Sequence, residues 1–145
     1  SEAELKMLGV IKAIKENAPL KIKATFLGAH AVPKLFKSDK QAYIDLIINT
    51  MLPEIARQKL ADFVDVFCEK GYFSVDDTEQ ILKAAAQYGL VPKIHVNQFN
   101  AFGGVKLGVQ YKALSVDHLE ILEQEDIEVV KHSDTIHVAL HGCSM

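Results

Sequence analysis

Apolar positions along the chain follow two periods in turn, one typical of helices and one typical of buried strands. The first segment, residues 1–17, places leucine and isoleucine at helical intervals, and Ser1 and Glu4 have the spacing of a capping box. Short apolar runs then alternate with helical patterns. We expect strands at 21–30, 62–69, 91–98, 113–118 and 135–141, with helices at 1–17, after 38, after 74, at 103–111 and at 124–132.

Local signals mark several of the helix ends. Ser38 and Gln41 give a second capping-box spacing, and Ser74 and Asp77 give a third. Pro53 interrupts or restarts the helix that follows Ser38, because proline has no N–H to continue the helical ladder. Gly89 ends the helix that follows Ser74, and the pair at 103–104 permits a tight helix entry or a close approach of the backbone to a ligand.

The order of the elements is a helix, then strand and helix repeated four times, then a strand. Strict alternation with mostly apolar strands predicts an α/β fold with a parallel sheet and crossover helices. Two architectures fit this order: part of a (βα)8 barrel, or an open doubly wound sheet. Five strands are too few for a whole barrel. The stretch FLGAHAVP after the first strand is not a glycine-rich dinucleotide motif, which disfavours a nucleotide-binding or flavodoxin-like module.

Composition narrows the function classes. The 145 residues suit one domain, 1–145, and 49% hydrophobic with 24% charged residues is typical of a globular protein. A net charge of -3 and scattered basic residues argue against nucleic acid as a partner. No apolar run approaches the roughly 20 residues of a membrane span, so we expect no membrane partner. Cys68 and Cys143 form no paired motif, which favours reduced thiols in the cytoplasm.

Polar side chains stand where each predicted strand ends. Ligands of parallel α/β folds bind at the carboxyl ends of the strands, so these side chains are expected to converge at one end of the sheet. Four of the six histidines are among them. Imidazoles beside a carboxylate are suited to metal binding or acid–base chemistry. The strand-end residues are His30, Glu69, His95 with Gln98, Asp117 with His118, and His141.

The last strand carries a second pair of histidines. His137 and His141 are four residues apart and so share a face of that strand. One interpretation makes His137 a hydrogen-bonded or partly exposed residue in the middle of a strand, and we favour it. The other makes His137, His141 and Cys143 an added metal site.

Five strings of the sequence together identify a family. In chain order they are TFLGAHAVP, LADFVDVFCEKGYFS, GLVPKIHVNQF, GGVKLGV and ALSVDHLE. They resemble imidazolonepropionase, of the amidohydrolase superfamily, across nearly the whole chain. The resemblance implies a cytoplasmic hydrolase of histidine degradation. Such an enzyme opens the ring of 4-imidazolone-5-propanoate to give N-formimino-L-glutamate in a metal-dependent (βα)8 barrel.

The resemblance also assigns roles by position. It implies that His95 is a metal ligand, that His118 assists water activation and that His30 contacts the substrate. Gln98 matches a Glu or Gln that contacts the substrate and the water. One zinc or iron ion is the implied cofactor, and the implied partner is a small molecule.

Departures from the family pattern limit what is carried over. The family takes further metal ligands from a His-x-His pair and from an aspartate on its eighth strand, and this sequence has no His-x-His. It therefore resembles the central barrel strands, three to seven. Val96 and Asn97 stand where the family has Ala-Asp, and Leu140, His141 and Gly142 stand where it has Leu-Pro-Gly.

These departures leave two functional interpretations. The first is an imidazolonepropionase whose site is only partly contained in this chain, so that the isolated chain is inactive or weakly active. The second is a non-catalytic barrel fragment or scaffold. In both, the outer strands, KIKATFLG and TIHVAL, are expected to have unpaired edges and the helix-free side to expose Val and Ile, which favours a homo-oligomer.

Overall fold

A computed structural model describes residues 2–140 and contains one parallel sheet of five strands in the order β1-β2-β3-β4-β5. The strands are β1 (Thr25–Ala29), β2 (Phe63–Cys68), β3 (Val91–Val96), β4 (Ser115–His118) and β5 (Ile136–Ala139). The helices are α1 (Glu2–Asn17), α2 (Lys40–Leu46), α3 (Leu52–Gln58), α4 (Val75–Gln87), α5 (Gly104–Gln110) and α6 (Gln124–Lys131). Two short helical turns, η1 (Lys34–Phe36) and η2 (Ile47–Met51), lie on either side of α2.

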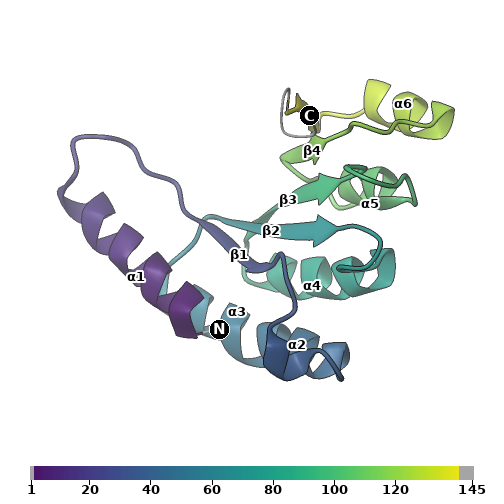
Figure 1. The fold of residues 1–145 in the computed structure, drawn as a ribbon. Coiled ribbons are helices and arrows are strands. Elements are labelled where there is room, and N and C mark those ends of the chain that lie inside the picture. The colour runs from purple at the N-terminus through teal and green to yellow at the C-terminus, as the bar shows by residue number, and fades with distance from the viewer. Residues whose placement is uncertain (1, 141–145) are drawn as a thin grey trace.

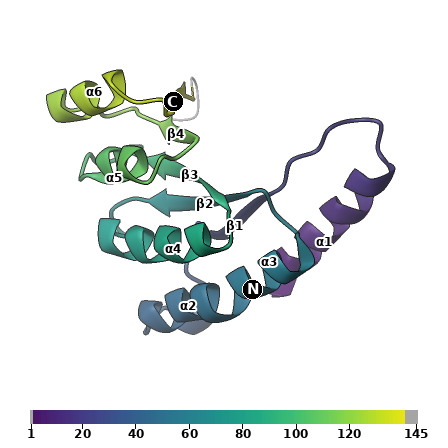
Figure 2. The same cartoon turned by 180° about the vertical axis from the view of Figure 1, so that it is seen from behind.

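The strand order decides between the two expected architectures. Each strand pairs in parallel with the next one along the chain, and the order never reverses. A doubly wound sheet reverses its strand order at a switch point, whereas a barrel adds its strands in sequence. Helices α4, α5 and α6 stack beside the sheet in the same order as the strands (Figures 1 and 2). The fold is therefore α/β and resembles part of a barrel, as expected.

Of the predicted helix signals that residues 2–140 test, all but one are confirmed. Ser74 and Asp77 form a reciprocal capping box at the start of α4. Pro53 lies in the first turn of α3, after the π-helical turn η2, so it restarts the helix. The expected cap at Ser38 is wrong by one residue, because Asp39 accepts the hydrogen bond from the Ala42 backbone instead.

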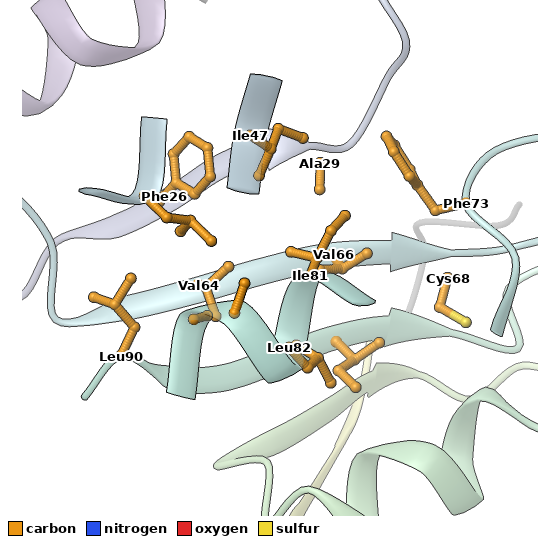
Figure 3. Close-up of a cluster of buried hydrophobic side chains, with 14 of the residues drawn as sticks. Phe26, Ala29, Ile47, Val64, Val66, Cys68, Phe73, Ile81, Leu82 and Leu90 are labelled. Atoms are coloured by element: carbon orange, nitrogen blue, oxygen red, sulfur yellow. The ribbon is translucent and has the colours of Figure 1, made fainter. Parts of the chain in front are cut away.

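One face of the sheet packs against helices and holds the core. Val64 and Val66 of β2 are fully buried and meet Ile81 and Leu82 of α4 (Figure 3). At the start of α5, a Cβ on Gly104 would lie 2.8 Å from Val96 Cγ1 and 3.1 Å from Cys68 Sγ. The glycine pair at 103–104 therefore serves close packing of α5 on the sheet. We call this side, formed by the even-numbered residues of β2 and β3 and by Val116 of β4, the helix face.

Helix α1 lies beside the free edge of β1. The Glu4 carboxylate accepts a hydrogen bond from the Leu27 backbone N–H at 2.8 Å, and Lys12 Nζ donates to the Gln58 carbonyl of α3. Ser1 lies outside the described residues, so its proposed capping bond with Glu4 is not tested. The expected open edge of the first strand is thus occupied at one N–H. None of the helices within residues 2–140 is long and apolar enough to cross a membrane.

Candidate metal and acid–base site

The other face of the sheet carries polar side chains in register. We call this side, formed by the odd-numbered residues of β2–β4, the open face. Asp65 of β2 pairs with Lys93 of β3, and His95 of β3 pairs with Asp117 of β4. Residues paired in a parallel sheet project to the same side. Two carboxylates, one ammonium group and one imidazole therefore share the face that α4 and α5 do not cover.

Two of these groups, Asp65 and His95, converge with His30 toward the carboxyl ends of the strands. His30 follows β1 directly, and its ring centroid lies 4.7 Å from that of His95. Asp65 Oδ1 lies 2.9 Å from His95 Nδ1 and 3.4 Å from His30 Nε2. One candidate ligand atom from each of the three residues lies within 4.8 Å of the others. Two imidazoles and a carboxylate at this spacing suit a divalent metal ion.

Asp65 and His95 each favour the charged form of the other. Burial alone would raise the pKa of Asp65, but its contacts with the His30 and His95 rings outweigh burial and lower that pKa to about 2. Burial alone would lower the pKa of His95, but the hydrogen bond and charge of Asp65, together with the charge of Asp117, raise it. Asp65 is therefore a carboxylate across the neutral range. Lys93 Nζ adds positive charge at 4.0 Å from its second oxygen.

His118 extends the cluster to β4. Its ring centroid lies 5.2 Å from that of His95, and its Nδ1 lies 3.1 Å from Glu120 Oε1. The backbone at His118 and at Leu119 is left-handed, with φ of 86° and 60°. Non-glycine residues rarely adopt this conformation, and where they do they are frequent at functional sites. The structure thus brings together three of the predicted site residues, His30, His95 and His118.

Glu69 lies at the same edge, but its carboxylate anchors a loop. It is fully buried and accepts hydrogen bonds from the Phe99 N–H at 2.9 Å and from Asn100 Nδ2 at 3.0 Å. Burial opposes ionisation of Glu69, but these bonds and the one from the Lys70 N–H hold its pKa below the ordinary value. Gln98 is half-buried in the loop that Glu69 holds. The structure gives no hydrogen bond of the Gln98 side chain, so its role stays a prediction.

Asn97, one of the departures from the family pattern, has a structural explanation. It is buried, and its Nδ2 donates to the Ile121 carbonyl and to Asp126 Oδ2, both at 2.9 Å. Asp126 also caps α6 by accepting from the Glu123 N–H. An aspartate at position 97 would have no N–H to donate to the Asp126 carboxylate. In this chain the amide of Asn97 supplies that donor.

A cleft of about 790 Å³ opens between the loops that follow β1 and β2, and its lining includes Glu69 but none of the clustered histidines. Ala31, which follows His30, and Tyr72, whose ring lies 4.4 Å from that of Phe67, are among its lining residues. Phe67 in turn stacks on His30 at 6.2 Å between ring centroids. The cleft is large enough to hold a small molecule next to the site.

His137 lies apart from the cluster. It pairs with Val116, a core residue of the helix face, whereas Val138 is the β5 residue in register with Asp117 and His95. His137 therefore belongs to the opposite face from His95, as an exposed residue in the middle of a strand. The proposed partners His141 and Cys143 lie outside the described residues, so the added metal site is not tested.

Sequence reasoning missed Asp65, the residue that links two of the histidines. DFVDVFCE was interpreted only as a buried strand ending in a glutamate. The signal in the sequence was the alternation along the strand, where Asp65 stands between the apolar residues Val64 and Val66. In the structure Asp65 is only 1% exposed. A charged residue so deep in a strand needs partners, and those partners are the histidines of the neighbouring strands.

Fold and site together define a class: part of a parallel α/β barrel with a histidine–carboxylate cluster at the carboxyl ends of its strands. No protein-family model matches the chain. It is 60% identical over 144 residues to the imidazolonepropionase of Christiangramia forsetii. This match covers 99% of this chain and 35% of that protein. It is 63% identical over 143 residues to that of Flavobacterium johnsoniae and 41% identical over 143 residues to that of Alkaliphilus oremlandii.

These matches confirm the resemblance to imidazolonepropionase that the five sequence strings indicate. The chain spans about a third of the length of the curated relatives it matches. What it shares with them is therefore one continuous segment, and the activity of a whole enzyme is a separate question.

Proposed function

We propose that this chain supplies the central part of an imidazolonepropionase, a metal-dependent hydrolase. The reaction opens the ring of 4-imidazolone-5-propanoate to N-formimino-L-glutamate. The observation that carries the proposal is the convergence of His30, His95 and His118 at the carboxyl end of the sheet, in a segment 60% identical to a protein of that name. In this proposal residues 1–145 form one α/β domain that corresponds to barrel strands three to seven.

The donor set at the open face fits a zinc or iron ion. Imidazole nitrogen and carboxylate oxygen are common ligands of both metals. Two side-chain atoms there, His30 Nε2 and Asp117 Oδ1, are buried without a well-formed hydrogen bond among the described residues. Buried polar atoms normally have partners, so these atoms favour a ligand or another part of the enzyme at the site. When bound, such an ion makes water a nucleophile near neutral pH.

Each predicted site residue has a role that its surroundings support. His95 would hold the metal through Nε2, since Nδ1 is engaged by Asp65. His118 would move a proton during water activation, steadied by Glu120 at its Nδ1. His30, beside the cleft, would contact the substrate, and Gln98 would contact the substrate and the water.

We also propose that the isolated chain is inactive or weakly active and associates with itself. A catalytic zinc site commonly takes three protein ligands and a water, and the family supplies the others from strands outside this segment. Leu27, Val91 and Ile136, which pairs with Ser115 of the open face, are each at least 40% exposed. In a second copy such side chains would find apolar partners. Sedimentation should show concentration-dependent association that Ile136→Lys weakens, whereas a monomer at all concentrations would contradict it. The resemblance further implies a cytoplasmic location.

A chimera tests the function directly. The matching segment of the Christiangramia forsetii protein is replaced by this chain, and consumption of 4-imidazolone-5-propanoate is measured. The chimera should be active. His95→Ala should reduce kcat/KM by more than the roughly 100-fold typical of a residue that only supports a metal ligand.

The matched control is His137→Ala, a histidine on the opposite face of the sheet. It should leave kcat/KM within about twofold, as expected of a surface change away from the site. An active chimera that tolerates His95→Ala would overturn the proposal. A folded, metal-loaded but inactive chimera would also contradict it.

A further inference from the structure

The two oxygens of the Asp65 carboxylate have different partners. Oδ1 lies 2.9 Å from His95 Nδ1 and 3.4 Å from His30 Nε2, whereas Oδ2 faces Lys93 Nζ at 4.0 Å. The side chain of Asp65 is only 2% exposed, so water does not compete for Oδ1 as it would at the surface. Of the two imidazole contacts, only the one to His95 is a well-formed hydrogen bond.

This hydrogen bond has a consequence for the proton on the His95 ring. An ionised carboxylate can only accept hydrogen bonds, so the nitrogen that faces Asp65 must carry the proton. When His95 is neutral, its proton is therefore on Nδ1 and the lone pair is on Nε2. Free histidine in water prefers the opposite tautomer. A ring nitrogen binds metal only through its lone pair, so the bond to Asp65 selects which nitrogen is available.

We propose that Asp65 is a positioning residue that holds His95 in the Nδ1–H tautomer and leaves Nε2 to the metal ion. The inference rests on the proposed function for its metal but not for its tautomer. Metal-binding histidines commonly donate their second N–H to a carboxylate, which fixes the orientation of the ring. The resemblance assigns no role to Asp65. In this proposal Asp65 acts through His95 and does not itself contact the metal or the substrate.

The experiment measures the tautomer of His95 by nitrogen NMR on the 145-residue chain without metal, at mildly alkaline pH. The Nδ1–H form is expected in the wild type. Asp65→Ala removes the acceptor and should return His95 to the Nε2–H form. Asp65→Asn keeps an acceptor oxygen without the charge and should retain much of the Nδ1–H form, which separates orientation from charge.

Asp117→Ala is the matched control. Asp117 carries the same charge on the same face, in register with His95 and 3.7 Å from Lys93, and its Oδ1 has no hydrogen-bond partner among the described residues. Its loss should leave the tautomer of His95 unchanged. Zinc titration of the wild type and the Asp65 variants should show affinity lowered about 10–100-fold by Asp65→Ala and less by Asp65→Asn.

The possible outcomes separate the two proposals. A wild-type chain with His95 already in the Nε2–H form would overturn the role of Asp65. So would an Asp65→Ala chain that stays folded and keeps both the tautomer and the zinc affinity. Zinc bound through Nδ1 of His95 would equally overturn the role of Asp65, because Asp65 would then not reserve that nitrogen for its own hydrogen bond. A correct tautomer that depends on Asp65, in a chain that takes up no zinc, would support positioning and contradict zinc binding by the isolated chain.

Discussion

The two faces of the sheet are built by the same strands but differ in chemistry. On β3, Ile94 of the helix face is fully buried against α4 and α5, whereas His95 of the open face keeps a quarter of its side chain exposed. On β2, Val64 and Val66 fill the core, and Asp65 between them turns to the histidines. Alternation along a strand therefore separates stability from chemistry, one residue at a time.

The comparison also sharpens an expectation about the open face. We expected it to expose Val and Ile, and it does so at Val91 and Ile136. Its centre is polar, with Asp65, Lys93 and Asp117 in neighbouring strands. This polar centre is where a ligand would bind, and the apolar positions are where protein would cover the face.

Truncation on the helix face should have the largest effect on stability. Ile94→Ala would leave a cavity under α5 and should lower the free energy of unfolding by about 2–5 kcal/mol. His95→Ala, one residue along, should cost less, about 1–2 kcal/mol, because a quarter of the side chain is exposed and Asp65 keeps its contacts with His30 and Lys93. Urea unfolding of both variants measures the difference. Equal losses would break the distinction between the two faces.

Glu69 should stabilise the site loop through its charge. Glu69→Gln would place its amide donor against either the Phe99 N–H or the Asn100 side chain, both of which donate to the carboxylate, and should cost about 2 kcal/mol at neutral pH. The folded-state pKa of Glu69 is depressed, so its contribution is present above an unfolded pKa of about 4.3 and is lost as pH falls below it.

Unfolding of the wild type and of Glu69→Gln across acid pH measures this contribution. The gap in stability between the two proteins should narrow as pH falls below about 4. A gap that stays constant or widens in acid would show that the negative charge of Glu69 is not what holds the loop.

Asn97→Asp should have the smallest effect of the three. The substitution keeps the size of the side chain and tolerates the left-handed backbone, φ 54°, but it replaces a donor to Asp126 by a second carboxylate. We expect a loss of about 1–2 kcal/mol at neutral pH. The loss should shrink in acid, where the pair can share a proton, as thermal unfolding at two pH values would show. No loss at neutral pH would mean that Asn97 is not needed for this contact.

Periodicity and caps were sufficient to predict the fold, whereas the site needed the register between strands. Apolar spacing located the strands, and Ser74 with Asp77 marked the start of α4 correctly. The ends of strands predicted His30, His95 and His118, since parallel strands finish at one edge of a sheet. The contact between Asp65 and His95 depends on how β2 and β3 align, which the single strands do not encode. For the same reason, no local pattern showed that Asp39 rather than Ser38 would cap α2.

The most direct measurement is the shift in melting temperature that zinc causes in the 145-residue chain. A ligand that binds only the folded state raises the melting temperature with its concentration. If the metal is held on the open face by His95, zinc should stabilise the wild type and Ile94→Ala by similar amounts and should have almost no effect on His95→Ala. Zinc stabilisation that survives in His95→Ala and disappears in His137→Ala would contradict the account and would place the metal at the C-terminal histidines.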